Sequence, residues 1–95
     1  MKNVNIEVII MAVATSFNVS PIDIVKGTLG DKQLMYARDV CAYLLSGKMP
    51  RRKIPALLGR SSSSYYYEAL KKVRAKCVED QHFQRRVMKL AYRFN

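Results

Sequence analysis

The sequence predicts an all-α protein, a compact bundle of five or six helices that includes a helix-turn-helix. Apolar residues recur at helical spacing in successive segments of the 95-residue chain and make up 49% of it. With 4 Gly, 3 Pro and no Trp, the composition favours helices over a turn-rich β-sandwich. The length suits one domain, so residues 1–95 are expected to fold as a single unit.

The first two helices are expected in residues 5–27. An amphipathic helix is predicted over residues 5–18, because its apolar residues form one stripe of Ile6, Ile9, Ile10, Val13 and Phe17. A short helix follows, with Ser20 as N-cap, Pro21 in the first position and Gly27 at the end.

A third helix is expected from about Asp31 to Gly47. Its core face carries the apolar residues Leu34, Ala37, Cys41, Leu44 and Leu45. Arg38 lies about 80° from the centre of that face, at about 100° per residue. We therefore expect the Arg38 side chain to emerge at the edge of the core, presented to a partner.

The second half of the chain predicts three further helices. Residues 48–53 form a basic connector, and residues 54–59 form a short helix with Pro55 in its first turn. Residues 60–64 are expected to supply a turn and N-cap hydroxyls. A long helix to about residue 77 carries a stripe of Tyr66, Ala69, Leu70, Val73 and Cys77. The last helix carries Phe83, Val87, Leu90, Ala91 and Phe94 on one side.

The net charge of +10 is concentrated in one part of the chain. Residues 1–47 carry four basic and four acidic residues, so this half is neutral. Residues 48–76 carry nine basic residues and one acidic residue, a net +8, and residues 77–95 add +2. Such a basic stretch is typical of a surface that binds a polyanion. A solvated surface that only keeps the protein soluble is the simpler alternative.

The short helix, glycine turn and serine-capped helix of residues 53–73 have the spacing of a helix-turn-helix. The second helix of this motif enters the major groove of DNA, which is wide enough for an α-helix. With Tyr66 in the core, the outward face carries Ser64, Tyr67, Glu68 and Lys71. Glu68 either accepts a hydrogen bond from a cytosine amine or pairs with Lys71 or Lys72, and the pairing is favoured.

The other predicted DNA contacts come from the connector, the turn and the rest of the second helix. Basic side chains there are expected to hold phosphates, while Ser64, Tyr67 and Lys71 reach base edges or phosphates. The predicted set is Arg38, Lys48, Arg51, Arg52, Lys53, Arg60, Ser61, Ser62, Ser63, Ser64, Tyr65, Tyr67, Glu68, Lys71 and Lys72. Arg74 and Lys76 are expected to support the same backbone contacts.

No enzyme is predicted from the reactive side chains. The serines of residues 61–64 have no nearby base, and the tyrosines of residues 65–67 lack the acid and base groups that a nucleophilic tyrosine needs. Cys41 and Cys77 are too far apart for a zinc motif and are expected to be buried, reduced thiols. His82 has no Cys or His at ligand spacing. We expect no catalytic residue, metal or cofactor, and no membrane span, which needs roughly 18 apolar residues.

The order of the elements resembles the C-terminal DNA-binding domain of the bacterial replication initiator DnaA. The resemblance covers residues 5–94 and rests on the runs Val13 to Val19, Asp23-Ile24, Ala37 to Leu44, Ile54 to Gly59 and Glu68 to Val73. It implies a Trp-repressor-like helical fold that binds a short duplex site, with an arginine in the minor groove beside the helix-turn-helix. Arg38 matches that arginine, with Asp39 in place of the family's glutamine.

The chain departs from this family at its signature, Gly-Gly-Arg-Asp-His-Thr-Thr. Here the turn reads Gly59-Arg60-Ser61-Ser62-Ser63-Ser64-Tyr65, without the Asp and His that make specific contacts in the family. A gapless alignment places Ser61 opposite the family's arginine and keeps Tyr66 in the apolar stripe, whereas pairing Arg60 with it requires an insertion. The gapless alignment is preferred because it preserves packing. The initiator's ATPase domain has no counterpart in these residues, so ATP binding is not implied.

The leading hypothesis is a stand-alone protein that binds double-stranded DNA site-specifically. It would regulate replication or transcription in a bacterium or phage, as a cytoplasmic, nucleoid-associated monomer. One alternative is an interaction module that keeps the fold and binds a replication or transcription protein. Another is a binder of structured RNA or of nucleic acid without sequence preference, with its tyrosines as stacking platforms.

Overall fold

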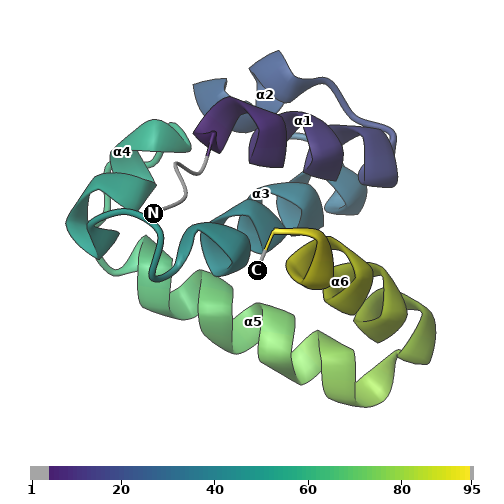
Figure 1. Cartoon of the computed structure of the whole chain (residues 1–95). Helices are drawn as coiled ribbons and strands as arrows, with labels where there is room; N and C mark the ends of the chain where they lie inside the picture. The colour runs from purple at the N-terminus through teal and green to yellow at the C-terminus, as the bar shows by residue number, and fades with distance from the viewer. Residues whose placement is uncertain (1–4, 95) are drawn as a thin grey trace.

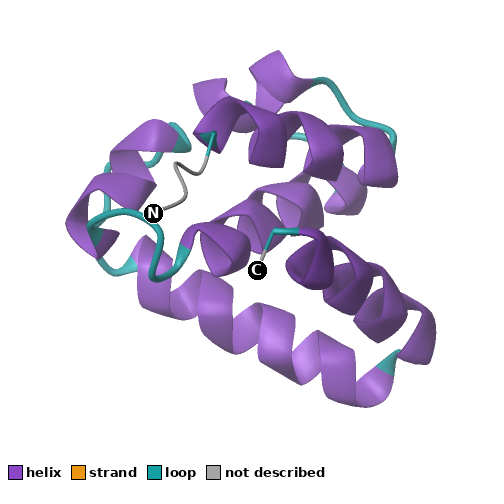
Figure 2. Ribbon diagram, viewed as in Figure 1, coloured by secondary structure: helices purple, strands orange, loops and turns teal. Residues whose placement is uncertain are grey.

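A computed structural model describes residues 5–94; Lys2 and the two ends of the predicted 1–95 domain lie outside this range. Within it the chain is all-helical, as expected, and its helices pack into one compact bundle (Figures 1 and 2). None of these helices is long and apolar enough to cross a membrane. The elements are α1 (Ile6–Phe17), α2 (Pro21–Lys26), α3 (Lys32–Leu45), the 3-10 helix η1 (Arg51–Lys53), α4 (Ile54–Leu57), α5 (Tyr65–Glu79) and α6 (Gln81–Arg93).

The ends of α1 and α2 follow the capping residues in the sequence. The Asn5 side chain accepts hydrogen bonds from two backbone N–H groups of the first turn of α1, at 3.0 and 3.3 Å. Asn18 ends α1 in the left-handed conformation, with φ of 56°. Ser20 is the N-cap of α2, Pro21 begins the helix and Gly27 ends it, as predicted. The Ser20 side chain makes no capping hydrogen bond.

Helix α3 is the centre of the bundle, with α1 and α2 on one side and α5 on the other (Figure 1). The predicted apolar face is buried in full, and four further residues of α3 are buried with it. Because other helices pack on two sides of α3, its buried face is wider than a single apolar stripe. The additional buried residues are Arg38, Asp39, Val40 and Ala42.

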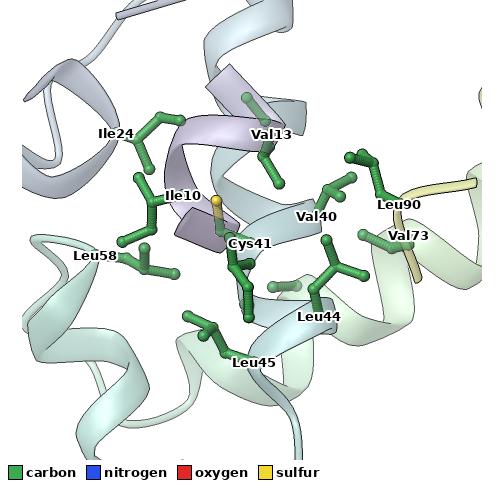
Figure 3. Close-up of a cluster of buried hydrophobic side chains, with 14 of the residues drawn as sticks. Ile10, Val13, Ile24, Val40, Cys41, Leu44, Leu45, Leu58, Val73 and Leu90 are labelled. Carbon is green, nitrogen blue, oxygen red and sulfur yellow. The ribbon is translucent and has the colours of Figure 1, made fainter. Parts of the chain in front are cut away.

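The core forms where side chains of the other helices meet α3. Figure 3 shows Ile10 and Val13 of α1, Ile24 of α2, and then Leu58, Val73 and Leu90, around Val40, Cys41, Leu44 and Leu45. Cys41 is fully buried, and burial raises the pKa of its thiol to about 12. Cys77 is also a free thiol but is only half-buried, so the predicted burial holds for one cysteine of the two.

The segment between α3 and α5 turns back onto the end of α2. Residues 51–53, within the predicted basic connector, form a 3-10 helix, and Pro55 lies in the first turn of α4 as expected. Gly59 and Gly27 both have φ of +70° and are packed backbone to backbone. A Cβ on either glycine would come within 3.0 Å of backbone atoms of the other. The turn before α5 is therefore held directly against α2.

Helix α5 continues into α6 with one residue between them. It extends two residues beyond the predicted end, to Glu79. Asp80 ends α5 and caps α6, because its carboxylate accepts a hydrogen bond from the N–H of Phe83 at 3.1 Å. That hydrogen bond lowers the pKa of the Asp80 carboxyl.

The backbone contact between Gly27 and Gly59 predicts that Gly59→Ala destabilises the protein more than Gly47→Ala does. Gly47→Ala places a Cβ at a φ of +81° with nothing within 4 Å, and should cost about 1–2 kcal/mol of unfolding free energy through backbone strain. Gly59→Ala adds a clash with Gly27 and should cost a further 1–3 kcal/mol or so. Urea denaturation of the two variants measures the difference, and equal losses would rule out a structural role for the Gly27–Gly59 contact.

Candidate nucleic-acid interface

The predicted DNA contacts divide into an exposed and a buried group. The exposed residues lie on η1, on the turn before α5 and on α5 itself. They are Arg51, Arg52, Lys53, Ser61, Ser62, Ser63, Ser64, Tyr67, Glu68, Lys71 and Lys72. Lys48, Arg60 and Tyr65 are half-buried, and Arg38 is buried.

The apolar stripe of α5 packs against other helices, and this leaves the polar face of α5 exposed. Tyr66, Ala69, Leu70 and Val73 are buried, and the contacts of α5 are mainly with α3 and α6. A hydrogen bond of 2.6 Å joins the Tyr66 hydroxyl to Ser46 Oγ after the end of α3. Tyr66 therefore belongs to the stripe, as the gapless alignment requires, and residues on the opposite side of α5 face solvent.

Tyr67 connects α5 to the 3-10 helix. Its ring is 57% exposed and packs edge-on against Tyr66, with 5.1 Å between the ring centroids. The guanidinium of Arg51 lies 5.8 Å from the centre of the Tyr67 ring, a cation–π distance. This contact brings η1 beside the first turn of α5. We use the term basic surface for Arg51, Arg52, Lys53, Ser61, Ser62, Ser63, Ser64, Tyr67, Lys71 and Lys72.

The serine turn does not cap α5 as predicted. Ser64 precedes the helix with helical backbone angles and makes no capping hydrogen bond with its side chain. Its hydroxyl instead donates to Glu68 Oε2 at 3.3 Å, and a 2.7 Å hydrogen bond joins it to the hydroxyl of Ser62. The favoured pairing of Glu68 with Lys71 or Lys72 is also wrong: Glu68 accepts a hydrogen bond from Ser64, and the ion pair made by α5 within residues 5–94 is Lys76–Asp80.

Tyr65 points into the protein and not toward solvent. Its hydroxyl donates to Asp39 Oδ1 at 2.9 Å, and Asp39 is only 5% exposed. Burial raises the pKa of both the Tyr65 hydroxyl and the Asp39 carboxyl. The Tyr65 hydroxyl is therefore engaged internally, contrary to the predicted DNA contact. Of the three consecutive tyrosines, Tyr67 is exposed, Tyr65 is half-buried and Tyr66 is buried, so the run does not present three rings for stacking.

Arg38 occupies a buried position that the sequence prediction had wrong. Its side chain is 1% exposed, whereas we expected it to emerge at the edge of the core. Its Nε donates to the carbonyl of Ile24 at 3.0 Å, and its Nη2 donates to the carbonyls of Asp23 at 2.7 Å and Thr28 at 2.8 Å. Arg38 therefore holds the C-terminal end of α2, and no arginine is presented to a minor groove from this position.

The burial of Arg38 has an identifiable physical cause. The last carbonyls of a helix have no partners within it, and α2 is too short to keep these groups in solvent while Ile24 is buried. A guanidinium supplies several donors in a fixed plane, so one side chain satisfies three carbonyls. The sequence signal was an arginine beside the core face of α3, opposite a short helix ended by Gly27. Asp39, next in the chain, was not among the predicted functional residues.

The comparisons with known proteins add no family assignment. No protein-family model matches the chain, and no curated protein matches it. Among residues 5–94 there is no cluster of three or more His, Cys, Asp or Glu that could hold a metal ion. The basic surface is therefore the feature of the molecule that indicates its function.

A structural role for Arg38 and a role in contacting the minor groove predict opposite results for Arg38→Met. Loss of hydrogen bonds to three carbonyls should lower the unfolding free energy by about 3 kcal/mol or more, measured by urea denaturation followed by circular dichroism. Lys71→Met is the control, since this exposed substitution should change stability by less than about 0.5 kcal/mol. Wild-type stability with weakened DNA binding in Arg38→Met would instead show that Arg38 makes the predicted minor-groove contact and has no structural role.

Proposed function

We propose that the chain binds double-stranded DNA through its basic surface, with α4, the turn and α5 acting as a helix-turn-helix. The observation that carries this proposal is the exposed side of α5, where Tyr67 and Lys71 face solvent beside Arg51 of η1. A helix exposed along one side, with cations at its flanks, suits a major groove that admits an α-helix and is bordered by phosphates. Most of the net charge of the chain lies in this region.

The two parts of the basic surface have different roles in this proposal. The cations of η1 bind the phosphate backbone and supply most of the affinity, without regard to sequence. Sequence reading falls to the outward residues Ser64, Tyr67, Glu68 and Lys71, because Arg38 is engaged within the protein. The resemblance to the initiator domain supports a role in regulating replication or transcription in a bacterium or phage, in association with the nucleoid.

The salt dependence of duplex affinity tests the proposed contacts. Four to five phosphate contacts from the cations of the basic surface should give a slope of log K against log salt of about −4 to −5. Arg52→Ala removes a cation of η1 and should reduce the steepness of that slope by about 1 and weaken binding, whereas Arg85→Ala removes an equal charge from α6 and should leave both nearly unchanged. Fluorescence anisotropy with a labelled duplex measures both quantities. An affinity nearly independent of salt would contradict the proposal.

Selection from a random pool of duplexes tests whether binding is site-specific. We expect enrichment of a short site, and Tyr67→Ala should change the enriched sequence if Tyr67 contacts bases. Lys53→Ala should weaken binding to all sequences alike. A pool that shows no enrichment, or a preference for single strands in competition, would limit the chain to binding without sequence recognition.

A protein partner is the second candidate function, and one observation favours it. A groove of about 730 Å³ runs between α1 and α6, with Val8 and Met11 exposed in it and Arg86, Lys89 and Arg93 among its lining residues. An apolar floor beside three cations fits an amphipathic helix with acidic residues at its edges. Such a partner would belong to the replication or transcription machinery.

Met11→Glu tests this second function separately from DNA binding. It should weaken binding of an acidic amphipathic helical peptide at least tenfold, because it removes apolar contact and places a negative charge opposite an acidic ligand; calorimetry measures the affinity. Affinity for duplex DNA should stay unchanged, because α1 lies outside the basic surface. Equal peptide affinity in the two proteins would eliminate the groove as the docking site.

A further inference from the structure

A second concave site lies between α3, the turn before α5 and α5 itself. The pocket has a volume of about 400 Å³. Its lining includes two guanidinium groups, those of Arg38 and Arg60, together with the Lys72 side chain and Ser61 and Ser62 of the turn. Three cationic side chains and two serines therefore converge on one hollow from three segments of the chain.

Two of these side chains carry buried N–H donors that have no partner. Arg38 Nη1 and Arg60 Nε are almost completely buried and make no hydrogen bond. Burying a charged donor without an acceptor is costly, and native proteins leave few such groups unsatisfied. Arg38 is fixed in place, because its Nε and Nη2 hold the carbonyls at the end of α2. Because the other guanidinium nitrogens hold the side chain in place, Nη1 cannot turn toward another acceptor.

The acidic residues of the pocket do not satisfy these donors. Asp39 accepts the hydrogen bond from Tyr65, and Glu68 accepts the one from Ser64. Counting every charged residue in the lining, three cations face two carboxylates, which leaves one excess positive charge. Arg60 is close enough to Arg38 to lower its pKa further after the main effect of burial. A bound anion would offset this repulsion and supply acceptors.

We propose that this pocket binds one phosphate group, with Arg38 Nη1, Arg60 Nε and the hydroxyl of Ser61 as donors. Guanidinium groups match the spacing of phosphate oxygens better than other cations do, and two of them with a hydroxyl suit a tetrahedral oxyanion. The group would link α3 to the turn before α5 and fix that turn. In the DNA complex it is a backbone phosphodiester, and this part rests on the proposed function; inorganic phosphate is the other source of the same chemistry.

Titration of the whole chain with inorganic phosphate tests the pocket without DNA. At constant ionic strength, with chloride as the reference anion, phosphate should shift the Nε–H resonances of Arg38 and Arg60 in an NMR titration. The melting temperature should rise by roughly 5 °C or more once phosphate exceeds its dissociation constant tenfold. Arg60→Gln should abolish the rise, and Arg85→Gln, a matched loss of charge on α6, should retain it. Ser61→Ala should weaken phosphate binding without removing it.

Specific outcomes would overturn the proposal. Equal effects of phosphate and chloride on the wild-type protein, or a full phosphate effect in Arg60→Gln, would each show that the pocket does not bind phosphate. A parallel binding experiment with duplex DNA then distinguishes a backbone phosphodiester from inorganic phosphate as the bound group. If phosphate binds but duplex does not, the pocket stands and the proposed DNA function fails. If duplex binds equally well to Arg60→Gln and in excess phosphate, the pocket takes free phosphate and no backbone phosphodiester.

Discussion

The buried guanidinium of Arg38 is the interaction on which the arrangement of the other elements depends. It joins α3, the centre of the bundle, to the carbonyls that end α2 and to Thr28 just beyond. The end of α2 in turn carries Gly27, whose backbone packs directly on Gly59 of the turn before α5. One charged side chain thus positions a short helix, and that helix positions the turn from which α5 begins. A helix of six residues would have little stability of its own without this support.

This arrangement separates the residues that build the interface from those that are presented on it. Tyr66 and Tyr65 point into the protein, where they form hydrogen bonds with Ser46 and Asp39. These hydrogen bonds fix the rotation of α5 about its axis. Tyr67 therefore faces outward, where Arg51 packs on its ring. Because the cations of η1 and α5 are exposed while the core beneath is uncharged apart from Arg38 and Asp39, charge is concentrated where a polyanion could meet it. The same packing leaves the hollow between Arg38 and Arg60, in which two donors lack partners.

Local signals were sufficient for most helix boundaries and for the core. Asn5, Pro21 and Gly27 act through neighbouring backbone groups, so their effect can be anticipated from the chain alone. The apolar stripe of α5, with Tyr66 in it, follows from helical periodicity in the same way. The hydrogen-bond partners of the turn serines were harder to predict, because a hydroxyl has several possible partners within reach. Ser64 bonds to Glu68 where a helix cap was expected.

The sequence by itself determined an all-helical bundle, the order and approximate bounds of its helices, their apolar faces and the concentration of charge in residues 48–76. These properties depend on spacing of 3 or 4 residues and on composition, which act over short distances along the chain. Only the tertiary structure decided the roles of Arg38, Asp39 and Tyr65. Each lies near the boundary of a helical face, and whether such a residue is buried depends on how many elements cover that helix. Since α3 is covered from two sides, an arginine expected at the surface became a structural residue of the core.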